Sequence, residues 1–236
     1  MSIAFPCAYQ VTLRRLLRPT ERSPSILPHL RRLVTSVYLA PTFLCYGRTI
    51  TTFTLYPLHL DASAASSGLS HSLRQAKTVR ILQTVNAPTF TPVDLVFFLR
   101  PVPPSLSVIT EQERGLCELG PHYDDGWFGE LAKILQIVTS LHTYVVRCVK
   151  FSIEDWVTNS NPHVEEYTNL LRVHVPRGQF PAFTRVILEL GVMESDPWIC
   201  WVFERSGAYH SDWEAKRNHT RHLNIAERES DMYLRP

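Results

Sequence analysis

Acidic and histidine side chains gather in one stretch of the chain where general acid–base chemistry would be possible. A histidine beside a carboxylate is a common arrangement for general acid–base catalysis near neutral pH. The candidate group within residues 122–166 consists of His122, Asp124, Asp125, Glu154, Asp155, His163, Glu165 and Glu166. Residues 163–166 follow Asn161-Pro162, a dipeptide typical of loops, so the competing interpretation is a solvated turn. An enzyme of unknown class with its site in 122–166 is therefore one of two functional interpretations.

A second group of histidines lies near the C-terminal end, where a metal site could be considered. His210, His219 and His222 lie close in sequence to Asp212 and Glu214. A helix beginning at residue 212 would place His219 and His222 on one face. Zinc prefers four tetrahedral ligands, and no cysteine or suitably spaced acid completes such a set nearby. We therefore predict no metal ion and no cofactor.

The established catalytic and redox motifs are missing from the sequence. There is no Gly-x-Ser-x-Gly elbow and no glycine loop for a phosphate group. The five cysteines are far apart and include no Cys-x-x-Cys pair, which indicates free thiols in a reducing compartment. They are Cys7, Cys45, Cys117, Cys148 and Cys200. We predict that the protein is not an enzyme and that it works in the cytoplasm or the nucleus.

The charge distribution is asymmetric along an otherwise ordinary globular composition. Hydrophobic residues make up 44% of the chain and charged residues 19%, and no apolar run is long enough for a membrane-spanning helix. Residues 1–110 contain 11 Lys and Arg against 3 Asp and Glu, whereas residues 111–236 contain 13 against 19. A basic half can bind an anionic partner. These arginines are scattered among leucines rather than clustered with aromatic residues, so we predict neither a nucleic-acid nor a membrane partner.

The N-terminal segment has its own composition. Residues 1–20 carry three arginines and no acidic residue, which is typical of a mitochondrial presequence; the alternative is an ordinary surface helix. We divide the chain into a basic N-terminal segment at 1–25, an α/β domain at 26–211 and a charged C-terminal tail or helix at 212–236. The basic first segment and the charged last segment are thus set apart from the α/β domain between them by their composition.

Hydrophobic patterning predicts an α/β fold. Strings rich in β-branched and aromatic residues predict strands at 33–38, 51–55, 79–84, 106–109, 145–150, 171–175 and 185–190. Asp124 and Asp125 precede apolar residues with helical spacing and predict a helix over 127–140. Capping signals predict further helices at 153–159 and 198–206. Because most connections between the strands are a dozen residues or longer, we expect parallel neighbours in one sheet.

Several strings of the chain resemble the irregular leucine-rich repeats of fungal F-box-like proteins. They are "ILPHLRRLVTSVYLAP", "FLRPVPPSLSVIT", "LAKILQIVTSL", "IEDWVTNSNPHVEEYTNLLRVHV" and "FTRVILELGV". Three of the intervals between the centres of the predicted strands are 27 residues long, inside the range of about 20–29 for such repeats. The alternative is a non-repetitive α/β domain.

The resemblance implies a partial solenoid with a mostly parallel sheet and short return helices. Such a protein would be a non-enzymatic module that binds another protein through its strand face. On the predicted strand 171–175, the partner-binding positions would be Arg172 and His174. No set of helices resembling an F-box is found in residues 1–50, so a role in ubiquitin ligation is not implied.

Overall fold

The computed structural model consists of two compact units, residues 1–107 and 108–236, which we call unit 1 and unit 2. The structure describes residues 2–4, 31–36, 44, 50–56, 77–85, 105–114, 123–149, 162–191, 198–205 and 213–220. Within these ranges no helix is both long and apolar enough to span a membrane.

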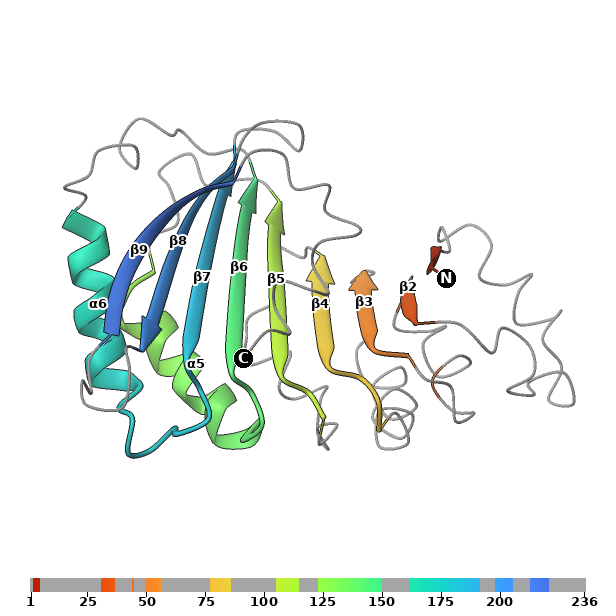
Figure 1. The fold of residues 1–236 in the computed structure, drawn as a ribbon, viewed down its shortest axis with the longest axis horizontal. Coiled ribbons are helices and arrows are strands. Elements are labelled where there is room, and N and C mark those ends of the chain that lie inside the picture. Colours follow the sequence, from red (N-terminus) through yellow and green to blue (C-terminus); the bar gives the residue numbers. More distant parts are fainter. Residues whose placement is uncertain are drawn as a thin grey trace, which may run out of the picture. The chain divides into compact units, whose positions relative to one another are not determined.

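Unit 1 contains four short parallel strands that are neighbours in chain order (Figure 1). They are β1 (Ser2–Ala4), β2 (Arg32–Ser36), β3 (Thr52–Tyr56) and β4 (Ile81–Val85). The register places Leu33, Phe53 and Leu82 in one row across three strands. All three side chains are buried, so this row forms the centre of the described core of the unit.

Unit 2 contains two successive strand–helix–strand crossovers followed by two antiparallel strands (Figure 1). The order is β5 (Val108–Arg114), α5 (Asp125–Ile137), β6 (Thr143–Val149), α6 (Pro162–His174) and β7 (Arg185–Gly191), then β8 (Trp198–Arg205) and β9 (Trp213–Thr220). The strands β5, β6 and β7 are parallel, and β8 and β9 are antiparallel to their neighbours. The predicted α/β class with a mostly parallel sheet is confirmed.

Both helices of unit 2 pack against the same face of its sheet. The ring of Trp127 on α5 lies 5.9 Å from that of Tyr144 on β6, and Tyr167 on α6 lies 6.4 Å from Phe203 on β8. Tyr144 and Phe203 belong to one row of the sheet because Val186 is the register partner of both. Successive strand residues point to opposite faces, so the neighbouring row points away from the helices. We call that side of the sheet the opposite face.

Most of the predicted elements are present. The strands predicted at 33–38, 51–55, 79–84, 145–150 and 185–190 are β2, β3, β4, β6 and β7, with ends displaced by at most two residues. The strand predicted at 106–109 begins later and is longer, as β5. The helix predicted at 127–140 is α5. The helix predicted at 153–159, and residues 5–25 of the N-terminal segment, lie outside the described residues.

The predicted strand 171–175 is wrong, because residues 162–174 form helix α6. Tyr167 and Leu171 are one helical turn apart, and both are buried. Arg172 and Val173 are consecutive and exposed, which fits a helix and not the alternation of a strand. Pro162 at the first helical position, with acidic residues in the first turn, was the overlooked signal of a helix start.

The helix predicted at 198–206 is also wrong, because residues 198–205 form strand β8. Its residues 200–203 are buried on both faces of the sheet, and an uninterrupted apolar run does not distinguish a buried strand from a helix. The charged segment from residue 212 was expected as a tail or a helix. Its described part, residues 213–220, is strand β9, in which buried Trp213 is followed by exposed Glu214.

Candidate functional site

The two predicted partner-binding residues lie on helix α6 and not on a strand. Arg172 is exposed, and its Nη1 donates to Oδ1 of Asn169 at 2.7 Å. His174 is the last residue of α6, and its Nε2 lies 2.7 Å from Oδ1 of Asp125 at the start of α5. This pair joins the ends of the two helices. The prediction that Arg172 and His174 lie on a strand is therefore wrong. Their role in partner binding stays a prediction.

The described members of the acid–base group do not converge on one site. Asp124 caps α5, and Asp125 pairs with His174. His163 and Glu166 face each other across one turn of α6, with Nδ1 and Oε2 3.5 Å apart and side chains 39% and 49% exposed. His122, Glu154 and Asp155 lie outside the described residues. The described pairs are thus helix-surface pairs with separate partners.

The second histidine group is only partly described. His219 lies in β9, whereas His210, Asp212 and His222 lie outside the described residues. Among the residues that the structure describes, no group of three or more His, Cys, Asp and Glu side chains could hold a metal ion. The absence of a metal ion stays a prediction from the sequence.

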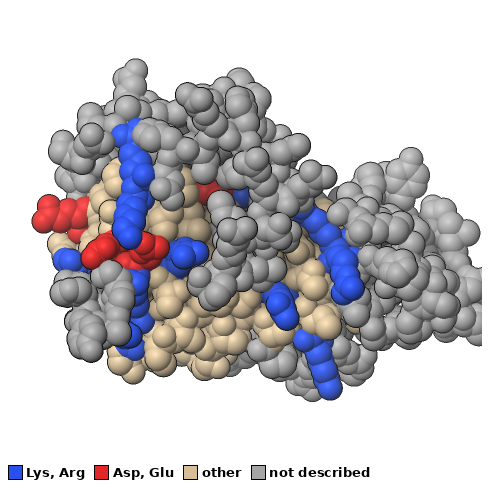
Figure 2. Space-filling model, viewed as in Figure 1, with Lys and Arg blue, Asp and Glu red and all other residues tan. Residues whose placement is uncertain are grey.

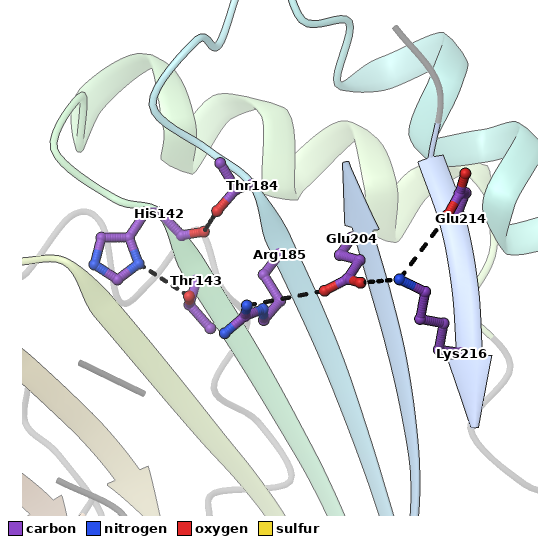
Figure 3. A network of polar contacts seen from close by, with 7 residues as sticks. All are labelled: His142, Thr143, Thr184, Arg185, Glu204, Glu214 and Lys216. Atoms are coloured by element: carbon purple, nitrogen blue, oxygen red, sulfur yellow. Dashed lines mark hydrogen bonds and ion pairs between the residues drawn. The ribbon is translucent and has the colours of Figure 1, made fainter. Parts of the chain in front are cut away.

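The structure instead brings charged residues together on the opposite face of unit 2, near the start of β7. In the space-filling view, side chains of both signs lie over the strands of this unit (Figure 2). The close view shows four of them in a line across three strands (Figure 3). We call this group the polar row; its members are Arg185, Glu204, Glu214 and Lys216.

The polar row alternates in charge because the strand register places opposite signs side by side. Arg185 and Glu204 are register partners, with Nη2 and Oε2 3.8 Å apart. The Lys216 ammonium donates to Oε1 of Glu204 and lies 4.0 Å from Oε2 of Glu214. The hydrogen bond to Glu204 raises the pKa of Lys216, so this ammonium stays charged at neutral pH. All four side chains are partly or largely accessible, with Lys216 55% exposed.

His142 lies at the end of this network, directly before β6. Its Nδ1 is 2.9 Å from Oγ1 of Thr143, and its carbonyl oxygen accepts a hydrogen bond from Thr184 Oγ1 at 3.3 Å (Figure 3). Burial lowers the pKa of His142, and the nearby Arg185 guanidinium lowers it further. The imidazole is therefore neutral at neutral pH, and the charge of the network comes from the polar row.

A second row of charged residues lies farther along the same strands but is buried. Arg147 Nε donates to Glu189 Oε2 at 2.7 Å, with side chains only 7% and 3% exposed. Cys200 is the register partner of Glu189. Burial, and next the Glu189 carboxylate, raise the pKa of Cys200 to about 12, so its thiol is protonated and unsuited to nucleophilic attack. This row is a structural ion pair rather than a catalytic group.

A repeated apolar pattern precedes the strands of both units. In five places two apolar residues three positions apart flank the beginning of a strand, and all ten side chains are at most 2% exposed. The pairs are Ile50 and Phe53, Val79 and Leu82, Leu106 and Ile109, Leu141 and Tyr144, and Phe183 and Val186. Sequence reasoning missed this pattern because it searched for the full leucine-rich core, whereas the part present in all five places is its beginning, apolar-x-x-apolar.

Hydroxyl side chains link the approaches to successive strands. Thr51 Oγ1 donates to the carbonyl oxygen of Arg31 at 3.2 Å, and Ser107 Oγ donates in the same way to Arg80 at 3.3 Å. Thr184 repeats the arrangement in unit 2 with His142. The same kind of hydrogen bond, from a hydroxyl side chain to a carbonyl oxygen before the neighbouring strand, thus occurs three times among the described residues.

Comparisons with known proteins return no relative: no family model matches the chain, nor does any curated protein or solved structure. The class of protein is therefore defined by its own fold. It is an α/β protein whose parallel strands follow one another in chain order within each unit and whose second unit presents the polar row.

Proposed function

We propose that this chain is a binding module of the leucine-rich-repeat type, without catalytic activity of its own, that holds another protein. The observation that carries the proposal is the buried apolar-x-x-apolar pattern before parallel strands in chain order. In leucine-rich repeats, similarly spaced apolar residues on each strand point into a core shared by neighbouring repeats. The exposed residues of the strands are then left for contacts with a partner.

The lengths of the repeats support an irregular version of this architecture. Residues that pair across neighbouring strands of unit 1 are separated by 20 residues (Arg32 and Thr52) and by 29 residues (Thr52 and Ile81). Both separations lie inside the range of about 20–29 residues for leucine-rich repeats. In unit 2, Val108, Thr143 and Arg185 are 35 and 42 residues apart, because each connection contains a helix of 13 residues. A partial solenoid with unequal return segments accommodates both, in keeping with the resemblance to fungal F-box-like proteins.

The polar row is the surface that we assign to partner contact. It consists of four charged side chains on strands, where backbone hydrogen bonds hold their positions more firmly than a loop would. Complementary charges at an interface raise the association rate and reject wrongly charged partners. The alternating signs of Arg185, Glu204 and Lys216 suit a partner that presents the reverse alternation.

Charge reversal on the two faces of unit 2 tests this assignment. The variants are Arg185→Glu with Lys216→Glu in the polar row, and Lys133→Glu, an exposed lysine on α5, as the control. Proteins captured by the tagged chain are compared quantitatively by mass spectrometry. We expect a protein retained by the wild-type chain to be lost with the polar-row variant and kept with the control. Equal retention by all three chains, or loss only with Lys133→Glu, would count against the polar row.

The enzymatic alternative has less support. His163, the one histidine of this group that the structure describes, pairs with Glu166 on the surface of α6. Asp125 of the group pairs instead with His174, which lies outside the range 122–166. For His122, Glu154 and Asp155, which lie outside the described residues, the alternative stays a prediction from the sequence.

A further inference from the structure

The described residues of unit 1 carry a second charged surface, and within them its sign is uniform. The charged residues that the structure describes in this unit are all basic: Arg31, Arg32, Lys77 and Arg80. Arg31, Lys77 and Arg80 are exposed, and Arg32 is partly buried. In the space-filling view the described part of this unit shows Lys and Arg side chains and no Asp or Glu (Figure 2). We call these four residues the basic edge, because they lie at the beginnings of β2 and β4.

The strand register determines the spacing of the basic edge. Thr51 N donates to the Arg31 carbonyl at 2.8 Å, and Arg80 N donates to the Thr51 carbonyl at 2.9 Å. Arg31 and Arg80 therefore lie in one row with Thr51 between them. Adjacent strands are about 4.8 Å apart, so the backbones of the two arginines are about 10 Å apart. An extended peptide advances about 3.3 Å per residue and so covers this distance in about three residues.

The polar groups around the basic edge are already engaged as donors. The hydroxyls of Thr51 and Ser107 donate to the carbonyl oxygens of Arg31 and Arg80. Those of Thr78 and Ser105 donate to the carbonyl oxygens of Ile50 and Val79. The edge therefore recognises a ligand mainly by charge. Single-stranded nucleic acid is usually bound by cations together with exposed aromatic rings on which bases stack. The aromatic side chain described in this unit, Phe53, is buried, which favours an acidic peptide over a nucleic acid.

We infer that the basic edge binds an extended acidic segment of a protein partner, with carboxylates at about every third residue. The inference rests on the proposed function in that the ligand is a protein, but it concerns another surface than the polar row. Carboxylates spaced in this way can each meet one strand-borne cation. Two acids on adjacent residues cannot, because they are only about 3.3 Å apart along the peptide.

Fluorescence anisotropy with the full chain and a labelled peptide of Glu-Ser-Ser units tests the inference. We expect Lys77→Glu with Arg80→Glu to weaken binding at least about tenfold, since each exposed pair changes from attraction to repulsion. The control Lys133→Glu, an exposed lysine on α5, should leave binding unchanged. A peptide of equal length with two adjacent glutamates (the contiguous peptide) should bind more weakly than a Glu-Ser-Ser peptide with two glutamates three residues apart. Added salt should weaken all binding, because exposed charges are screened.

Several results would overturn the inference: no binding of the Glu-Ser-Ser peptide, equal binding of the contiguous peptide, equal loss with Lys133→Glu, or tighter binding of an oligothymidylate of the same charge. Circular dichroism checks folding, and the neutral variant Lys77→Gln with Arg80→Gln should show an intermediate loss. If the polar-row variant loses its captured partner while the peptide fails to bind, only this inference fails. If the peptide binds as expected while the polar-row variant keeps its partner, the assignment of the polar row fails instead.

Discussion

At the scale of single residues, the buried thiol of Cys200 is the most protected reactive group among the described side chains. Its pKa is raised to about 12, so almost no thiolate is present at pH 8. We expect Cys200 to resist alkylation in the folded protein and to react fully in denaturant. Counting modified cysteines by mass spectrometry, with Cys200→Ser as the reference, checks this. Rapid labelling of Cys200 under native conditions would show that the site opens readily.

The buried pair of Arg147 and Glu189 predicts a strong effect of a single substitution. Arg147→Met removes one partner and leaves the Glu189 carboxylate buried and unpaired, which costs about 3–5 kcal/mol of unfolding free energy. Urea denaturation measures this loss. The double variant with Glu189→Leu should recover most of it, because no buried charge remains. If the double variant were as unstable as the single one, the loss would come from packing rather than from the charge.

His142 predicts how stability depends on pH. Burial, and next the charge of Arg185, hold its pKa in the folded protein below the ordinary histidine value of about 6.5, so the unfolded chain binds the proton more tightly. The contribution of His142 to stability is therefore complete above about pH 6.5 and is lost as the pH falls further. We expect His142→Gln to lose less stability than the wild type between pH 7 and pH 5. The unfolding free energy of both proteins is measured by denaturant unfolding at each pH. An equal decrease in the two proteins would show that groups other than His142 cause the pH dependence.

At the scale of elements, α5 depends on its N-terminal cap. Asp124 Oδ1 accepts a hydrogen bond from the Trp127 amide at 3.0 Å, and the carboxylate also interacts favourably with the helix dipole. Asp124→Ala should reduce the unfolding free energy by about 1 kcal/mol, and Asp124→Ser should restore much of that. Thermal or urea unfolding measures both. An unchanged stability in the alanine variant would mean that water replaces the cap at no cost.

Arg205 shows how a strand residue positions the segment after a helix. Its Nη1 and Nη2 donate to the carbonyls of Phe180 and Val175 at 2.7 and 2.6 Å, and its guanidinium lies 4.9 Å from the centre of the Trp213 ring. Burial, and next the charge of Arg177, lower its pKa to about 10, so it remains charged at neutral pH. Arg205 of β8 therefore links the segment 175–180, which follows α6, to Trp213 at the start of β9.

At the scale of the whole molecule, the repeated apolar pattern makes a prediction for each unit. Ile50→Ala in unit 1 and Leu141→Ala in unit 2 each remove a fully buried side chain, and each should cost about 2–5 kcal/mol. Because the chain forms two compact units, hydrogen exchange should increase most in the unit that carries the substitution. Equal increases in both units for both variants would instead indicate one cooperative structure.

Local signals in the sequence were enough to predict the helices and strands whose residue propensities agree with their position in the folded protein. The helix α5 has a capping residue, a helical apolar period and no competing β-rich string, and it was predicted correctly. The strands β3 and β6 are rich in β-branched and aromatic residues, and the long connections between strands correctly indicated parallel pairing. In these cases each residue's own preference already matches its place in the fold.

Tertiary structure decided the elements and contacts in which local preference was ambiguous or misleading. The string "LLRVHV" favours a strand by composition, yet it ends helix α6 because Tyr167 and Leu171 are buried one turn apart. The consecutive residues 200–203 of β8 are all buried, so they show no alternation of apolar and polar residues that would distinguish a strand from a helix. The polar row depends on register across β7, β8 and β9, and register is set by which faces are buried after folding. Periodicity along one segment therefore predicted elements, whereas the meeting of charges from separate segments required the assembled sheet.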